Sequence, residues 1–197
     1  IYDYDIIYLP EKLLEELAEE MLGDKRAHFF SHSVIKDDRL AGSLSKVFHM
    51  LSVKQERSDN LQELFYTTVC NILEKYGVGK NKINKPVITP ACIKKVCEYI
   101  EDTVGLPLSL DEMAGVAGVS KFHFLRLFQR SKGQTPHAYL NQIRLQKAKE
   151  ALKQGTNLAD VACNMGFADQ SHLTRSFKAA FGLTPKQYQK AVSVKYY

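Results

Sequence analysis

The sequence has no long apolar run and no paired cysteines. No stretch of about 18 apolar residues is present to span a bilayer, and no charged start followed by a short apolar core marks a secretion signal. The four cysteines, Cys70, Cys92, Cys97 and Cys163, form no C-x-x-C pair and have no histidine at metal-ligand spacing. We therefore expect a cytoplasmic protein with reduced thiols, no zinc site, no disulfide framework and no cofactor.

The positive charge is concentrated in the C-terminal half of the chain. The 197 residues are 45% hydrophobic, which predicts a packed core, and carry a formal net charge of +5. Residues 1–90 hold 12 Lys and Arg against 14 Asp and Glu, whereas residues 91–197 hold 15 against 8. Such a half suits a polyanion, because cations near a phosphate backbone displace condensed counterions. A merely solvated basic surface would have the same composition.

Residues 1–76 are expected to form a small α domain with short strands. Tyrosines alternate with acids over residues 1–9, which predicts a strand ending at Pro10, and residues 28–35 are a second candidate strand. Apolar stripes predict helices over 11–22, 40–51 and 61–73, with Gly23 as the first C-cap and Ser58 as the third N-cap. The last two helices form an antiparallel hairpin, which buries its stripe within the chain or against a second copy.

A change of composition at residues 77–88 marks the domain boundary. This segment, GVGKNKINKPVI, has two Gly, three Lys, two Asn and one Pro, which is typical of a solvated linker. Thr89 and Pro90 then supply the N-cap and first turn of a helix. From there to residue 197, nearly every segment has a helical pattern, so residues 89–197 are expected to form a second, all-α domain.

An internal repeat dominates this second domain. Residues 110–139 match residues 158–188 when Ala168 is treated as an insertion, and ten of the thirty aligned positions are identical. The identical residues of the first copy are Leu110, Ala114, Gly118, His123, Arg126, Phe128, Gly133, Thr135, Pro136 and Tyr139. The same supersecondary unit is therefore predicted twice.

Each copy has the pattern of a helix, a tight turn and a second helix. In the first copy, Ser109 and Glu112 form a capping box, Gly118 supplies the turn and Ser120 caps the next helix. In the second copy, Asn157 and Asp169 are the caps and Gly166 makes the turn, with Phe167 as a core plug. Two copies with matching caps predict helix-turn-helix units at about 109–132 and 157–181.

The repeat resembles the DNA-binding domain of the AraC/XylS family of bacterial transcription regulators. The resemblance covers about residues 88–192 and rests on the runs VSKFHFLRLFQRSKGQTPHAYL and ADVACNMGFADQSHLTRSFKAAFGLTPKQYQ. It implies a homeodomain-like double helix-turn-helix, double-stranded DNA and RNA polymerase as partners, and an activating role. Residues 1–76 resemble the helical tail of that family's regulatory domain, which implies possible dimerisation through these helices and a small-molecule effector bound by a preceding domain. Because the chain begins at Ile1, we expect it to be part of a longer protein.

In a helix-turn-helix the second helix enters the major groove, here helices 120–132 and 169–181. In the first unit, Phe124 and Phe128 are expected to point inward and Lys121, Phe122, Leu125, Arg126 and Gln129 outward, although Phe122 and Leu125 suit extra core as well. In the second unit, Leu173 and Phe177 are expected to point inward and Gln170, Ser171, Thr174, Arg175 and Lys178 outward. The predicted base contacts are Lys121, Phe122, Arg126, Gln170, Ser171, His172 and Arg175, although His123 and His172 are more typical of hydrogen-bonded structural residues.

A helix opened by Thr135 and Pro136 and ending near Lys153 is predicted to hold the two units on one face of the duplex. Its inward stripe is expected to be Tyr139, Leu140, Ile143, Leu145, Ala148 and Leu152. The predicted phosphate contacts on and around the two units are Ser120, Lys132, Arg144, Lys147, Lys149, Lys178 and Lys186.

Two other functions fit parts of the sequence. A DNA-repair alkyl transferase would need a reactive cysteine, and Cys163 is the candidate nearest the DNA, but it is expected on the buried side of its helix without a partner base. A protein-interaction module would use the helical hairpin and would not need to bind DNA. The duplicated unit favours a non-enzymatic DNA-binding regulator over both.

Overall fold

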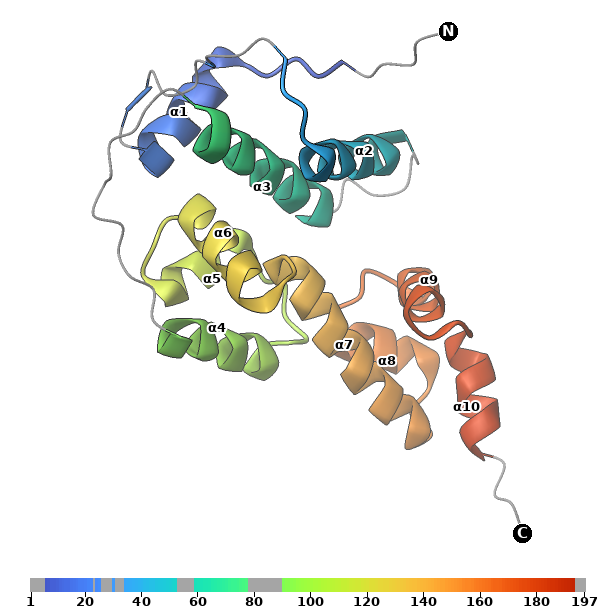
Figure 1. Cartoon of the computed structure of the whole chain (residues 1–197). Helices are drawn as coiled ribbons and strands as arrows, with labels where there is room; N and C mark the ends of the chain where they lie inside the picture. Colours follow the sequence, from blue (N-terminus) through green and yellow to red (C-terminus); the bar gives the residue numbers. More distant parts are fainter. Residues whose placement is uncertain are drawn as a thin grey trace, which may run out of the picture.

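The computed structural model describes residues 6–22, 24–25, 30, 34–52, 59–77 and 90–193. These residues form ten helices in two bodies, joined through the linker 77–88, of which only Gly77 is described (Figure 1). The N-terminal body has α1 (Glu11–Leu22), α2 (Asp38–Ser52) and α3 (Asp59–Tyr76). The C-terminal body has α4 (Pro90–Asp102), α5 (Leu110–Ala117), α6 (Lys121–Lys132), α7 (Pro136–Lys153), α8 (Leu158–Asn164), α9 (Gln170–Phe181) and α10 (Pro185–Ser193). The mainly α, double helix-turn-helix fold is as predicted.

The predicted strands do not form in the described part of the chain. Residues 6–10 and 34–35 are irregular, and the described β-pairing there is a single bridge between Phe30 and Gly77. A strand needs a neighbouring strand to accept and donate its backbone hydrogen bonds. The alternation of tyrosines with acids predicted a strand but not a partner for it. Residues 1–5 and the caps Gly23 and Ser58 lie outside the described residues.

Helices α2 and α3 pack as the expected antiparallel hairpin, and Asp37 fixes its open end. One carboxylate oxygen accepts hydrogen bonds from Lys75 Nζ at 2.7 Å and Tyr76 Oη at 2.6 Å, at the C-terminal end of α3. The other oxygen accepts the backbone N–H groups of Arg39 and Leu40 at 3.1 Å, and so caps α2. This cap was not predicted from the sequence.

Helix α1 packs against α3 and also against the C-terminal body. Leu17, Ala18 and Met21 of α1 share one buried cluster with Val69, Cys70 and Leu73 of α3 and with a phenylalanine of α6. Burial raises the pKa of the Cys70 thiol to about 12. The cluster is therefore the apolar centre of the contact between the two bodies.

The first helix-turn-helix unit has its own core beneath α4 and α7. Ile100, Met113, Phe124, Phe128 and Leu140 are fully or almost fully buried there. The predicted capping box is present: Ser109 Oγ accepts the N–H of Glu112 at 3.2 Å, and the Glu112 carboxylate accepts the N–H of Ser109 at 2.7 Å. The first unit therefore starts as the sequence predicts.

The second unit packs against the C-terminal half of α7, so this helix belongs to both cores. Leu152, Val161, Leu173 and Phe177 are fully buried in the second core. Figure 1 shows α7 running between the two units, with α9 and α10 at the far end from α1. No helix in the described part is long and apolar enough to cross a membrane.

Candidate nucleic-acid interface

The second unit presents α9 as an open helix with a polar outer face. Asn157 caps α8 through the N–H of Asp160 at 2.9 Å, and Asp169 caps α9 through the N–H of His172 at 2.7 Å. Between them Gly166 adopts φ 71° and Phe167 is buried. Leu173 and Phe177 are buried, as predicted, and four of the five polar side chains predicted to face outward are exposed, namely Gln170, Ser171, Arg175 and Lys178, whereas Thr174 is half-buried.

The start of α9 is fixed by contacts that leave this face uncovered. The ring of His172 packs edge-on against Phe167 at 5.3 Å between centroids, as suits the structural role predicted for it. The backbone N–H of His172 holds the pKa of the Asp169 carboxyl below its usual range, which keeps the cap ionised. Gln170 and Ser171 follow this cap directly, so the first turn of α9 starts from a capped and packed residue.

The first unit differs, because the side chains predicted to face the groove are covered. Phe122 is 8% exposed, Leu125 0% and Arg126 4%, so the prediction that they point to solvent is wrong for this structure. The ring of Phe122 lies 4.9 Å from that of Tyr66 on α3, among the apolar side chains of α1. These side chains are buried because α1 and α3, which are remote in the sequence, pack on the outer face of α6. That Phe122 and Arg126 contact DNA remains a prediction.

We call this contact of α1 and α3 with α6 and α7 the seam, and its polar centre is Glu74. One oxygen of Glu74 accepts from Arg126 Nη1 at 3.1 Å and the other from Arg130 Nη2 at 2.9 Å. Arg126 Nη2 lies 3.2 Å from His123 Nδ1, so His123 has the structural role predicted for it. Arg126 Nε is buried and has no acceptor in the described part of the chain.

A second polar contact joins the seam at the start of α7. The buried carboxylate of Glu63 lies 2.7 Å from His137 Nδ1 and accepts the backbone N–H of His137 at 3.1 Å. His137 Nε2 lies 3.0 Å from the carbonyl oxygen of Leu108, just before α5. One carboxylate of α3 therefore contacts α6 through Arg126, and another accepts a backbone N–H at the N-terminus of α7.

The rest of α6 stays partly accessible. Lys121 is half-buried, 4.0 Å from the carboxylate of Asp111, and Gln129 is half-buried. Ser120 is exposed and has the backbone geometry of an N-cap, but its side chain makes no capping hydrogen bond, contrary to the sequence prediction. The first unit therefore shows less of its predicted groove surface than the second.

The basic side chains among the predicted phosphate contacts fall into three groups by exposure. Lys132, Lys178 and Lys186 are exposed, as a phosphate contact requires. Arg144 is buried, and its guanidinium donates to the carbonyl oxygens of Val104 at 3.0 Å and Leu106 at 2.8 Å, so its assignment as a surface cation is wrong. Two half-buried lysines complete the set: Lys147 donates to the carbonyl oxygen of Glu101 at 2.6 Å, and Lys149 lies 5.0 Å from the Phe181 ring centroid.

No metal centre appears among the described residues. No group of three or more His, Cys, Asp or Glu side chains is arranged to hold a metal ion in that part of the chain. Cys163 is exposed near the end of α8, so the expectation that it faces the core is wrong. An exposed cysteine alone is not a reactive site.

Comparison with known proteins identifies the family. A family model described as a helix-turn-helix domain matches residues 113–191. The uncharacterized regulator YbfI of Bacillus subtilis is 34% identical over 171 residues, which is 87% of this chain and 62% of that protein. Multiple antibiotic resistance protein MarA of Salmonella typhimurium is 31% identical over 98 residues, which is 49% of this chain and 77% of that protein.

Solved structures agree with the sequence relatives. The C-terminal domain of the response regulator AraT of Geobacillus stearothermophilus superposes with a TM-score of 0.51 at 25% identity, over 56% of this chain and 93% of that chain. An AraC-type DNA-binding domain protein of Chromobacterium violaceum gives 0.50 at 25% identity, over 52% and 93%. This chain therefore belongs to the AraC/XylS family of transcription regulators and carries that family's helix-turn-helix DNA-binding domain.

Proposed function

We propose that the chain reads a specific double-stranded DNA site in two successive major grooves, with α9 in one groove and α6 in the next. The observation that carries the proposal is the open face of α9, where Gln170, Ser171 and Arg175 are exposed on a helix fixed by Asp169 and Phe167. Glutamine pairs with the N6 and N7 edge of adenine, and arginine with O6 and N7 of guanine. The exposed Lys178 and Lys186 suit the flanking phosphates.

Helix α7 connects the two helix-turn-helix units. Its 18 residues give a length of roughly 27 Å at about 1.5 Å per residue. Successive major grooves on one face of B-DNA are about 34 Å apart. If the two reading helices lie closer together than this spacing, both units can dock only on bent DNA, at a cost of about 1–6 kcal/mol that depends on its sequence.

In this structure the outer face of α9 is exposed, whereas much of the outer face of α6 is covered. Helix α6 cannot enter a groove about 12 Å wide while α1 and α3 cover Phe122 and Arg126 on its outer face. We take this arrangement as the masked state of the first unit. The buried, unpaired Nε of Arg126 opposes masking, because an unsatisfied donor of this kind costs about 1–3 kcal/mol. Release of α1 and α3 would return that donor to water or to a base.

The remaining parts of the proposal rest on family membership. The regulator would act as an activator in contact with RNA polymerase, as a homodimer through the N-terminal helices or as a monomer, and under control of a small-molecule effector. Exposed apolar side chains on the N-terminal body, among them Tyr8, Val34 and Leu51, are compatible with a further covering partner.

Selection of bound sites from random duplex DNA tests the proposal. We expect an enriched motif and a complex that survives excess non-specific competitor. The binding constant should fall steeply with added salt, because each neutralised phosphate releases counterions. Absence of any enriched motif would favour the protein-interaction alternative, and a flat salt dependence would contradict phosphate-led docking.

A further inference from the structure

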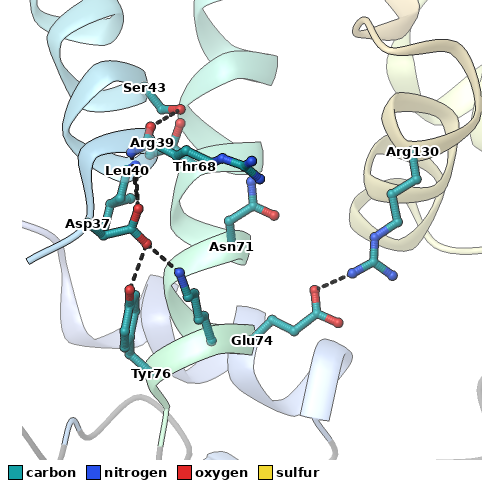
Figure 2. A pocket seen from close by; sticks show the side chains of 10 residues that line it. Asp37, Arg39, Leu40, Ser43, Thr68, Asn71, Glu74, Tyr76 and Arg130 are labelled. Atoms are coloured by element: carbon teal, nitrogen blue, oxygen red, sulfur yellow. Dashed lines mark hydrogen bonds and ion pairs between the residues drawn. The ribbon is translucent and has the colours of Figure 1, made fainter. Parts of the chain in front are cut away.

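A cavity of about 470 Å³ lies at the edge of the seam, where α2, α3 and α6 meet (Figure 2). Its walls come from the start of α2, the C-terminal half of α3 and, on the α6 side, Arg130. Pockets of roughly 300–1,000 Å³ hold metabolite-sized ligands. The cavity therefore has the size of a small-molecule site and takes its walls from both bodies of the protein.

The two acidic side chains of the cavity are already engaged. The carboxylate of Asp37 accepts four hydrogen bonds, from Lys75, Tyr76 and two backbone N–H groups. Both oxygens of Glu74 accept from guanidinium groups of α6. Little acceptor capacity remains for a cationic ligand, and the ammonium group of Lys75 is held by Asp37.

The two arginines of the cavity have more hydrogen-bond donors than the acceptors around them use. The Arg39 guanidinium has no hydrogen-bond or ion-pair partner among the described residues, and Arg130 uses one nitrogen toward Glu74. Figure 2 shows Arg39 extending from α2 across α3 toward the side-chain amide of Asn71, with Arg130 entering from the opposite side. A guanidinium has five N–H donors in a planar fork that matches carboxylate and phosphate oxygens.

We propose that this cavity binds a metabolite-sized anion, a carboxylate or a phosphate ester, between Arg39 of the N-terminal body and Arg130 of the DNA-binding domain. The anion groups would accept from the two guanidinium groups, while Asn71 and Ser43 offer hydrogen-bonding groups for a polar body. With three cations and two carboxylates, the walls of the cavity carry an excess positive charge that such an anion neutralises.

The position of the site gives the anion a regulatory effect, which rests on the proposed reading of DNA by α6. Arg130 faces Arg39 only while α1 and α3 cover α6, so the complete site exists only in the masked state. A ligand shifts an equilibrium toward the state that it binds more tightly, and the coupling is reciprocal. The anion therefore holds the first reading helix away from DNA, and DNA expels the anion.

Thermal unfolding of the full 197-residue chain tests the site. The probes are inorganic phosphate, glucose 6-phosphate and citrate, with glucose as the uncharged control, all at constant ionic strength. We expect a saturable rise in Tm with a phosphate probe, with citrate or with both, which also distinguishes the two anion classes. Sulfate-like salting effects raise Tm without saturation and equally in all variants. The rise should be lost in Arg39→Ala and Arg130→Ala and retained in Lys94→Ala, which removes an exposed cation from α4.

Failure of the site and failure of the proposed function give different results. The site is overturned if no probe gives a saturable rise or if Arg39→Ala responds like the unaltered chain, whether or not the chain binds DNA. If an anion binds, it should weaken binding to the selected DNA by roughly five- to 150-fold in the unaltered chain and much less in Arg39→Ala. Unchanged DNA affinity with a bound anion would overturn the regulatory effect.

Discussion

The carboxylate of Glu63 on α3 and the imidazole of His137 on α7 are 2.7 Å apart inside the seam. The same carboxylate accepts the backbone N–H of His137, and the far ring nitrogen faces the carbonyl oxygen of Leu108. Both ring nitrogens thus face oxygen atoms, and each nitrogen–oxygen contact needs one proton between its two atoms to be a hydrogen bond. This pair links the N-terminal helices to the start of the connecting helix and to the loop before α5.

Replacement of Glu63 should separate the contribution of these hydrogen bonds to the free energy of unfolding from the contribution of the negative charge. Glu63→Ala leaves His137 without its partner in a buried site and should lower the free energy of unfolding by about 3–5 kcal/mol. Glu63→Gln should lose much less, because its oxygen can accept the N–H of His137 and its NH₂ can donate to a neutral imidazole. Urea unfolding measures both variants. Equal losses would show that the negative charge, rather than the hydrogen bonds, stabilises the seam.

Loosening the seam at Glu74 should strengthen DNA binding. Glu74→Gln removes the carboxylate that holds Arg126 and Arg130 without altering any side chain predicted to contact DNA. We expect the dissociation constant for the selected site to fall on the order of tenfold, which corresponds to about 1.4 kcal/mol, as measured by fluorescence anisotropy. Glu98→Gln is the control for charge, because it removes an exposed carboxylate from α4. An equal gain in both variants would attribute the effect to net charge and contradict masking.

The open helix α9 should respond to substitution without any change of state. Gln170→Ala and Arg175→Ala should each weaken binding to the selected site by about 1–3 kcal/mol and relax the base preference at one position. Lys94→Ala on α4 should change affinity little and preference not at all. Arg126→Ala has two opposed effects, because it loses a predicted base contact and also loosens the seam. If neither α9 variant changes binding, the assignment of its outer face is wrong.

The α2–α3 hairpin should lose stability in acid through Asp37. The hydrogen bonds from the Lys75 ammonium and the Tyr76 hydroxyl hold the pKa of Asp37 well below its usual 3.8. The folded-state pKa is the lower one, so ionised Asp37 stabilises the fold above pH 3.8, and this contribution is lost as the pH falls below that value.

Thermal unfolding between about pH 6 and pH 2.5 checks the sign. Asp37→Asn should have the lower Tm at the upper end of this range, and the gap to the unaltered chain should close as the pH falls. Tyr76→Phe removes one of the two side-chain donors and should show the same trend at reduced size. A gap that stays constant with pH would mean that Asp37 acts by shape alone.

Local signals in the sequence predicted most of the helices and caps, whereas the seam depends on contacts that are remote in the sequence. Ser109, Asn157 and Asp169 cap the helices that follow them, because a cap is read from residues within one turn. The partners of Arg126 and Phe122 are Glu74 and Tyr66, more than fifty residues earlier. The available signal was the apolar character of Phe122 and Leu125 on a face that should meet DNA.

Arg144 shows a second limit of sequence patterns. Cationic side chains on a helix are usually solvated, and the predicted phosphate contact followed from that rule. Its guanidinium is instead buried because the loop after α4 leaves the carbonyl oxygens of Val104 and Leu106 facing α7. Buried carbonyls need donors, but the sequence does not show which carbonyls the loop will leave inside.

The turn of the second unit depends on this same arginine, and two glycines provide a matched test. Gly118 and Gly166 have φ of 70° and 71°, so alanine at either position costs about 1–2 kcal/mol in backbone strain. A Cβ at Gly118 would meet nothing within 4 Å, whereas a Cβ at Gly166 would lie 2.6 Å from Arg144 Nη2. Arg144 cannot withdraw without giving up its hydrogen bond to Leu106, so Gly166→Ala should lower the free energy of unfolding by about 1.5–3 kcal/mol more than Gly118→Ala.

Urea unfolding of both variants, alone and combined with Arg144→Lys, measures this difference. The extra loss of stability at Gly166 should largely vanish in the Arg144→Lys background. Equal losses for the two glycines in the unaltered background would show that Arg144 yields freely and does not fix the turn.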